Sequence, residues 1–212
     1  MISWRVLNIG HISRNKYWGE ESTRAYRDAV CTSVFINCGG VRIIVDPPLP
    51  PEQMDRLLDT RCGLKAKDID IVFITHSHGD HFAGLGAFGH ARRFLAPVEY
   101  SMLLSQGGPK ELLEQVKPAA RELAPGISVI DLPGHTHGLA GLEFRSGEGV
   151  VVVAGDAVMT REFFIGRSGY FNCADEAVST QTIDRIASRA DIVVPGHDNY
   201  FSVAVAGAHK GA

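Results

Sequence analysis

The feature of the sequence that constrains the fold most is an apolar run that ends in a group of polar side chains. Residues 69–74 are almost continuously hydrophobic, which is typical of a strand buried on both faces. The run is followed closely by His76, His78, Asp80 and His81. Polar groups at the end of a buried strand need a common partner, and zinc prefers imidazole nitrogen and carboxylate oxygen. Because so short a loop cannot turn all four side chains toward one ion without strain, the residues predict two ions, His76 and His78 on one, Asp80 and His81 on the other.

Composition and charge narrow the class of protein. The chain has 212 residues, of which 45% are hydrophobic, and its formal net charge is −3 at pH 7. No repeat, low-complexity segment or linker interrupts the sequence, so we expect a single domain over residues 1–212. The charge does not favour a nucleic acid or an anionic membrane as partner, since each usually requires a basic patch. We therefore expect a small-molecule substrate, and the sequence leaves the oligomeric state open, a homo-oligomer included.

The compartment is predicted from the start of the chain and from its cysteines. No secretory signal pattern follows Met1, and the apolar runs are too short to cross a bilayer. The four cysteines show neither CxxC spacing nor the density of a disulfide framework. We expect reduced thiols without a catalytic role, in a cytoplasmic protein that does not associate with a membrane.

Strand and helix patterns alternate along the chain, with hairpins mixed in. Strands are expected at residues 3–9, 32–37, 41–45, 69–74, 93–96, 127–132, 139–144, 150–154 and 192–194. One helix is expected to start at Pro50–Pro51, a short one to cover 82–88, and a last one to include residues 183–190. Residues 98–126 keep helical spacing, with a kink predicted at Pro118. This order favours a layered α/β protein with mixed sheets over a doubly wound parallel fold.

Further ligand-type residues follow three other expected strands. His135 lies in a Pro-Gly-His-Thr sequence, Asp156 follows Gly155, and His197 lies in a Pro-Gly-His sequence. A glycine before each of them permits a sharp turn at the strand end. Because sites in layered α/β proteins gather at strand ends, these side chains are candidates to join the residues at 76–81.

Taken in order, these motifs resemble the metallo-β-lactamase superfamily. The His-x-His-x-Asp-His motif at residues 76–81 is followed by His135, Asp156 and His197 in the family's sequence contexts, and Asp46 at the end of its strand matches the first family motif. The separations between the motifs are closer to those of the glyoxalase II-like branch than to those of the β-lactamases. The resemblance extends from about Thr32 to His197.

The resemblance implies a fold and a set of roles. The fold is a four-layer αβ/βα sandwich of two mixed β-sheets with helices on the outside and metals in a cleft along one edge. Asp156 would bridge the two ions, and Asp46 would orient a ligand imidazole. The remaining ligands would divide into one set for the first ion, His76, His78 and His135, and one set for the second, Asp80, His81 and His197.

The resemblance also implies hydrolysis by a hydroxide shared between two divalent ions, for which we expect zinc, while iron and manganese fit similar sites. Asp80 would act catalytically by orienting that hydroxide or moving its proton. The bond cleaved would be a small-molecule ester, thioester, lactone or phosphodiester. Candidate substrate contacts are Tyr17 and Trp18 in the long loop at residues 11–27, and Arg161 after the bridging aspartate. His137 either lines the cleft or faces solvent.

Two other classes of function stay open. A mononuclear iron oxidoreductase similar to the persulfide dioxygenases would use His76, His135 and Asp156. A binding module without catalysis would keep the fold alone, although a complete ligand set is costly to bury without a metal. Among hydrolases, the lactonase branch usually has a tyrosine three residues after the bridging aspartate, where this chain has Met159.

Overall fold

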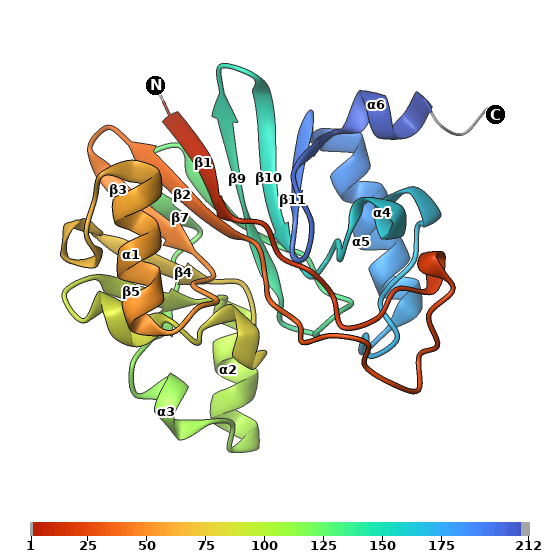
Figure 1. The fold of residues 1–212 in the computed structure, drawn as a ribbon, viewed down its shortest axis with the longest axis horizontal. Helices are drawn as coiled ribbons and strands as arrows, with labels where there is room; N and C mark the ends of the chain where they lie inside the picture. Colours follow the sequence, from red (N-terminus) through yellow and green to blue (C-terminus); the bar gives the residue numbers. More distant parts are fainter. Residues whose placement is uncertain (1, 209–212) are drawn as a thin grey trace.

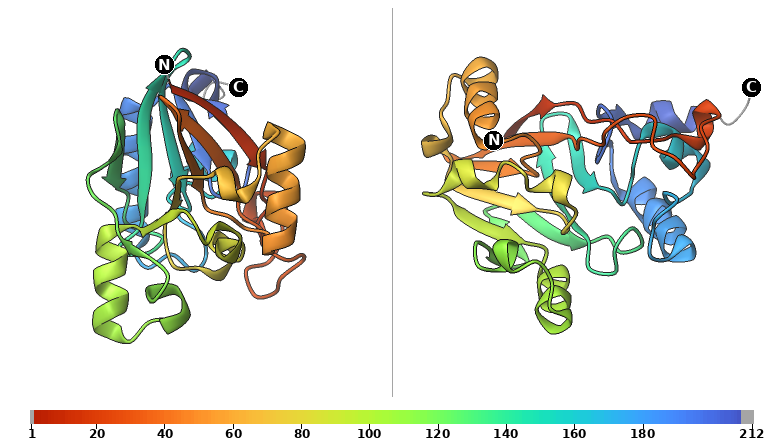
Figure 2. Two further views of the ribbon diagram at one scale, coloured as in Figure 1. Left: turned by 90° about the vertical axis from the view of Figure 1, so that its left-hand side faces the viewer. Right: turned by 60° about the horizontal axis from the view of Figure 1, so that its bottom comes forward.

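The computed structural model describes residues 2–208 and consists of two mixed β-sheets packed face to face, with helices on both outer surfaces (Figures 1 and 2). The four-layer αβ/βα sandwich expected from the sequence is confirmed. In the left view of Figure 2, the red-to-orange strands and the teal strands form two adjacent layers, with an orange helix outside one and a blue helix outside the other.

The first sheet contains six strands in chain order, and its first half is antiparallel while its second half is parallel. Its strands are β1 (Ile2–Asn8), β2 (Ser33–Cys38), β3 (Val41–Val45), β4 (Ile71–Ile74), β5 (Arg92–Leu95) and β6 (Lys117–Pro118). All four residues of β4 are buried, as the apolar run at residues 69–74 predicts.

The second sheet runs in the order β12-β11-β10-β9-β8-β7, and only its β10–β11 pair is parallel. Its strands are β7 (Glu122–Ala124), β8 (Ile127–Asp131), β9 (Ala140–Ser146), β10 (Gly149–Gly155), β11 (Ile192–Pro195) and β12 (Phe201–Ser202). Alternate residues of β10 face opposite layers: Val151 and Val153 join the core between the sheets, whereas Val152 and Ala154 pack with helix α5.

The helices divide between the two outer layers (Figure 1). With the first sheet lie α1 (Pro51–Cys62), α2 (Pro97–Gln106) and α3 (Lys110–Leu113), and with the second lie α4 (Arg161–Gly166), α5 (Glu176–Arg189) and α6 (Val203–Ala208). Short 3₁₀ turns occupy Lys16–Trp18, Ala66–Asp68, Gly79–His81 and Leu85–Phe88.

Helix ends follow the signals in the sequence. Pro51 occupies the first turn of α1, Met54 and Leu58 form its buried side, and Gly63 ends it in the left-handed conformation (φ 65°). The α5 helix begins earlier than the apolar spacing at 183–190 indicates, because the Asp175 side chain caps it by accepting from the Val178 N–H (2.9 Å).

Two expectations about helices are wrong. Residues 98–126 do not form one kinked helix: α2 ends at Gly107 (φ 71°), and after the short α3 the chain returns to strand in β6 and β7. Pro118 lies in β6, an edge strand paired only with β5, where the N–H that proline lacks is not needed. Residues 82–88 contain only the 3₁₀ turn Leu85–Phe88.

Candidate metal centre

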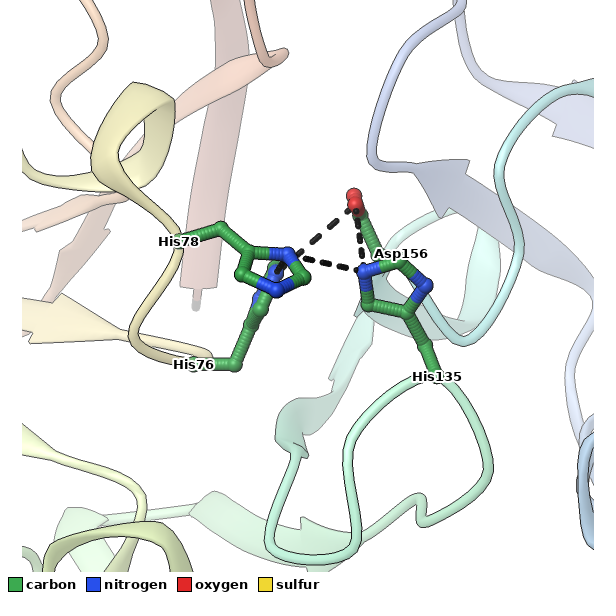
Figure 3. Close-up of side chains that lie close together, drawn as sticks. All are labelled: His76, His78, His135 and Asp156. Atoms are coloured by element: carbon green, nitrogen blue, oxygen red, sulfur yellow. Dashed lines mark hydrogen bonds and ion pairs between the residues drawn. The ribbon is translucent and has the colours of Figure 1, made fainter. Parts of the chain in front are cut away.

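The topology brings the ends of four strands together between the sheets. His76 and His78 follow β4 of the first sheet, whereas His135 follows β8 and Asp156 follows β10 of the second. Figure 3 shows the two pairs pointing at one another across the gap between the sheets. His197 follows β11, next to β10, so it reaches the same place.

Three imidazole rings and one carboxylate form the first group of ligand-type residues. The Nδ1 atom of His78 lies 2.9 Å from Nε2 of His76 and 3.0 Å from Nε2 of His135. Asp156 Oδ2 lies 3.2 Å from His135 Nε2 and 3.7 Å from His76 Nε2. Their ligand atoms all lie within 4.8 Å of one another, which places four donors around one point.

Asp80, His81 and His197 form the second group, and Asp156 contacts it with its other oxygen. Asp156 Oδ1 lies 3.2 Å from His81 Nε2 and 3.3 Å from His197 Nε2. Asp80 Oδ2 lies 3.5 Å from His197 Nε2. One carboxylate therefore directs one oxygen to each group.

The polar atoms at the centre of the cluster fit a cation better than they fit one another. His81 Nε2 and Asp156 Oδ1 are both buried and neither forms a hydrogen bond, although they face each other at 3.2 Å. Buried polar atoms in proteins are nearly always satisfied, by protein, water or ion. A divalent cation would satisfy these atoms, since imidazole nitrogen and carboxylate oxygen are common ligands of such ions.

Surrounding residues hold the rings of His81 and His197 so that their Nε2 atoms point inward. The Nδ1–H of His81 donates to Asp46 Oδ2 (2.9 Å), and Thr75 donates its N–H and its hydroxyl to the same carboxylate (2.8 Å each). Asp46 itself has φ 48°, an unusual conformation for a residue other than glycine. The Nδ1–H of His197 donates to the carbonyls of Val30 (2.9 Å) and His11 (3.1 Å). His11 therefore contributes its backbone to the site.

Burial and neighbouring charges set the protonation of the cluster. Burial lowers the pKa of His135 to about 4 and the pKa of His76 well below its ordinary value, so both rings are neutral at pH 7. Burial opposes ionisation of Asp156, but the neighbouring His197 and His81 outweigh it and hold the Asp156 pKa well below its usual range. Burial opposes protonation of His81 and His197, but neighbouring acidic groups, Asp156 among them, raise the pKa of both rings. Because metal ions bind neutral imidazoles and ionised carboxylates, an ion at the second group would displace a proton from each of these two rings.

Glu99 is a residue of the site that sequence reasoning missed. It is 4% exposed and lies in the first turn of α2. Its Oε1 accepts from the N–H (3.1 Å) and hydroxyl (2.6 Å) of Ser77, and its Oε2 accepts from the Thr136 hydroxyl (2.8 Å). Ser77 lies between His76 and His78, and Thr136 follows His135. One carboxylate thus joins ligand loops that come from different sheets.

No local signal in the sequence marks Glu99. It stands in an ordinary helical turn after Pro97, and its partners lie 22 and 37 residues away. The one hint is that Ser77 and Thr136 interrupt the two histidine motifs, and buried hydroxyls need an acceptor.

A small cavity of about 120 Å³ opens over the ligands. Five of the ligand-type residues line it, namely His78, Asp80, His135, Asp156 and His197, and the rest of its lining consists of Ile12, Ser13, Ala29, Met159, Tyr170, Phe171 and Asn172. Asp80 therefore borders the space in which a substrate would react.

Within residues 2–208, the four expected substrate contacts are not among the side chains that line this cavity. The Tyr17 hydroxyl bonds to that of Ser168 (2.9 Å), and the Trp18 ring, 56% exposed, donates to Glu162 (3.2 Å). Arg161 donates its backbone N–H to Asp198 (3.1 Å). His137 is exposed, which matches the second of its two interpretations.

Comparison with known proteins follows the same motifs. Residues 26–197 match the model of the metallo-beta-lactamase superfamily. The chain belongs to this superfamily. It is 30% identical to Metallo-beta-lactamase domain-containing protein 1 of Mus musculus over 86% of this chain and 65% of the mouse protein. It is 27% identical to an N-acyl homoserine lactonase of Bacillus cereus over 65% of this chain and 59% of that protein.

Superfamily members of known structure share the fold. A crystal structure of an AiiA mutant from B. thuringiensis, with N-decanoyl-L-homoserine bound at its active site, covers 93% of this chain and 92% of its own (TM-score 0.69, 19% identity). The chain spans about half to two thirds of the length of the curated relatives it matches. Among the described residues, no helix is both long enough and apolar enough to span a membrane.

Proposed function

We propose that this superfamily member is a dinuclear metal-dependent hydrolase of the glyoxalase II-like branch that cleaves an ester, thioester, lactone or phosphodiester bond in a small molecule. The observation that carries the proposal is the position of Asp156, whose two oxygens each contact a separate group of ligand-type residues. A single ion would need only one of these groups. The residues proposed for the first ion are His76, His78 and His135, and those for the second are Asp80, His81 and His197, with Asp156 shared.

The site residues divide the chemical tasks among them. Two divalent ions, for which we propose zinc, would lower the pKa of a water molecule and polarise the bond to be cleaved. Asp80 belongs to the second group of ligand-type residues and also lines the small cavity. Its carboxylate can therefore hold or move a proton of the attacking water. Asp46 keeps the His81 ring in the tautomer whose Nε2 lone pair faces the centre.

The proposal extends to the substrate class and the compartment. Two relatives carry the name N-acyl homoserine lactonase, which supports a cyclic or linear ester as substrate. Met159, at the sequence position where the lactonase branch usually has a tyrosine, lines the cavity, so the proposal covers esters in general and does not select lactones. All four cysteines are free, which supports the reducing cytoplasm.

The deciding experiment measures metal content per chain by plasma mass spectrometry on protein without a histidine tag, together with hydrolysis of ester, thioester, lactone and phosphodiester substrates. About two zinc ions and hydrolysis of one class support the proposal. About one iron and oxygen uptake with a persulfide would replace it with the oxidoreductase. Absence of metal after reconstitution would leave a binding module.

The variant Asp156→Ala tests the bridging role. We expect it to lose metal and to lose activity by at least about a thousandfold, because it removes one ligand from both groups at once. Asp59→Ala is the matched control, since Asp59 is an exposed carboxylate that pairs only with Lys65 on the surface. Full metal content and turnover in Asp156→Ala would contradict the assignment.

A further inference from the structure

A second cavity, of about 380 Å³, lies beside the candidate metal centre. It shares Tyr170 and Phe171 with the smaller cavity over the ligands. A molecule whose reacting bond lies at the metal ligands can therefore extend past these two side chains into the larger space. Pockets that hold small molecules typically measure about 300–1,000 Å³, so this space is large enough for the remote part of a substrate.

The walls of the larger cavity come from two distant parts of the chain. The segment between β1 and β2, red in Figure 1, runs across to α4 and α5 of the second sheet. The Tyr170 hydroxyl accepts from the Arg14 N–H (3.2 Å) and donates to the Arg14 carbonyl (3.0 Å). This pair of bonds holds the segment against the rim of the metal centre.

Two cations line the cavity without a carboxylate partner. Among residues 2–208, neither Arg14 nor Lys16 takes part in an ion pair. The Arg14 guanidinium lies 4.3 Å from the centre of the Phe171 ring, and its Nε is buried without a hydrogen-bond partner. The Lys16 ammonium lies 5.2 Å from the centre of the Phe163 ring.

The two carboxylates of the same cavity already have donors from the protein. Glu20 forms an ion pair with Arg27 and accepts from the Asn15 N–H (2.7 Å). Glu176 accepts from the Gly169 N–H (3.0 Å) and the Cys173 thiol (3.2 Å). Arg14 Nη1 donates to the Ser22 carbonyl, so the donors with unused capacity are the remaining N–H groups of Arg14 and the Lys16 ammonium, and both cations lie beside aromatic rings.

We infer that this cavity recognises a carboxylate at the far end of an apolar segment of the substrate. Arg14 provides a planar fork that matches a carboxylate, and Lys16 adds a point charge. The rings of Phe163, Tyr170 and Phe171 contact the apolar segment. This inference rests on the proposed function, and it narrows the substrate to an ester or thioester whose acyl part carries a terminal carboxylate.

The first test compares two esters of equal length, mono-4-nitrophenyl adipate, which carries the carboxylate, and 4-nitrophenyl hexanoate, which does not. We expect the wild type to prefer the adipate ester. The double variant R14Q/K16Q should lower the ratio of the two kcat/KM values about tenfold or more, mainly through KM, because it removes charge-assisted hydrogen bonds. Lys67→Gln removes an exposed lysine of the 3₁₀ turn Ala66–Asp68, which lines neither cavity, and it should keep the wild-type ratio.

The second test measures binding without hydrolysis, by calorimetry with 3-phenylpropionate and with the neutral 3-phenylpropan-1-ol. We expect the acid to bind more tightly than the alcohol to wild type, and this difference to be lost in R14Q/K16Q. The single variant K16Q changes one exposed side chain and serves as the test if the double variant does not fold. It should lose part of the difference in affinity between the acid and the alcohol.

The two tests separate the failure of this inference from the failure of the proposed function. Hydrolysis of both esters with equal efficiency, and equal binding of acid and alcohol, would overturn the carboxylate site and leave the hydrolase intact. Binding of the acid that depends on Arg14 and Lys16, without hydrolysis of any ester, would support the site and overturn the proposed function.

Discussion

At the scale of single residues, Glu99 leads to the sharpest prediction. Glu99→Ala leaves the half-buried Ser77 N–H and Thr136 hydroxyl without an acceptor, which costs at most about 1–3 kcal/mol for each unsatisfied group. It also frees both ligand loops, so we expect metal affinity to fall about 10–100-fold, as when partners of metal ligands are removed. Competition with a chelator and the visible spectrum of the cobalt-substituted protein measure the effect.

Two variants make the Glu99 test specific. Glu99→Gln keeps one carbonyl acceptor and should restore part of the lost affinity. Glu111→Ala removes an exposed glutamate of α3 whose side chain forms no described bond, and it should behave as wild type. A Glu99→Ala protein that binds metal as tightly as wild type would show that the carboxylate does not position the loops.

The cysteines provide a second prediction at this scale. Cys31 is fully buried, and burial raises its thiol pKa to about 12, so it stays protonated up to pH 9. Cys38 is also buried, whereas Cys62 and Cys173 are partly exposed. Because the thiolate is the reactive form, we expect at most two thiols to react with a disulfide reagent in the native protein and all four after unfolding. Rapid reaction of Cys31 at pH 8 would contradict this burial.

At the scale of elements, the segment at residues 11–27 depends on a few bonds to the second half of the chain. Tyr170→Phe removes the hydroxyl that bonds to Ser13 and Arg14. We expect a local loss of about 1–2 kcal/mol, seen as faster tryptic cleavage within 11–27 and faster amide exchange there. Tyr100→Phe is the control, since the Tyr100 hydroxyl forms no bond among the described residues. Equal cleavage rates in the two variants would show that the hydroxyl does not hold the segment.

At the scale of the whole molecule, the proposed metal ligands come from both sheets, so bound ions would join the two halves of the sandwich. Free metal at a hundred times its dissociation constant adds about 2.7 kcal/mol to the free energy of unfolding. For a chain of 212 residues we expect a chelator to lower Tm by about 5–10 °C. Calorimetry with and without the chelator checks this, with Asp156→Ala as the variant that should not respond. An unchanged wild-type Tm would argue against metal in the folded protein.

The central strand, the layered fold and the ligand-type residues could be predicted from local patterns in the chain. Residues 69–74 form a continuous apolar run because β4 is covered on both faces, and such a run can be recognised in the sequence without knowledge of the fold. His135, Asp156 and His197 were also predictable, because polar residues directly after buried strands are rare unless they share a partner. The structure places all of them in one cluster with the residues at 76–81.

The contacts between segments that lie far apart in the chain could not be predicted in this way. The spacing of apolar residues in 98–126 is compatible with a helix. Whether residues such as those of β6 and β7 form strands depends on pairing with β5 and β8, which the local sequence does not reveal. The hydrogen bonds of Glu99 and the two directions of the Asp156 oxygens depend on loops from both sheets. The same holds for the larger cavity, whose walls at Arg14 and Tyr170 lie 156 residues apart in the chain. Local sequence patterns indicate which residues are buried, because burial selects for apolar side chains. Which buried residues contact one another depends on how the two sheets and their loops pack.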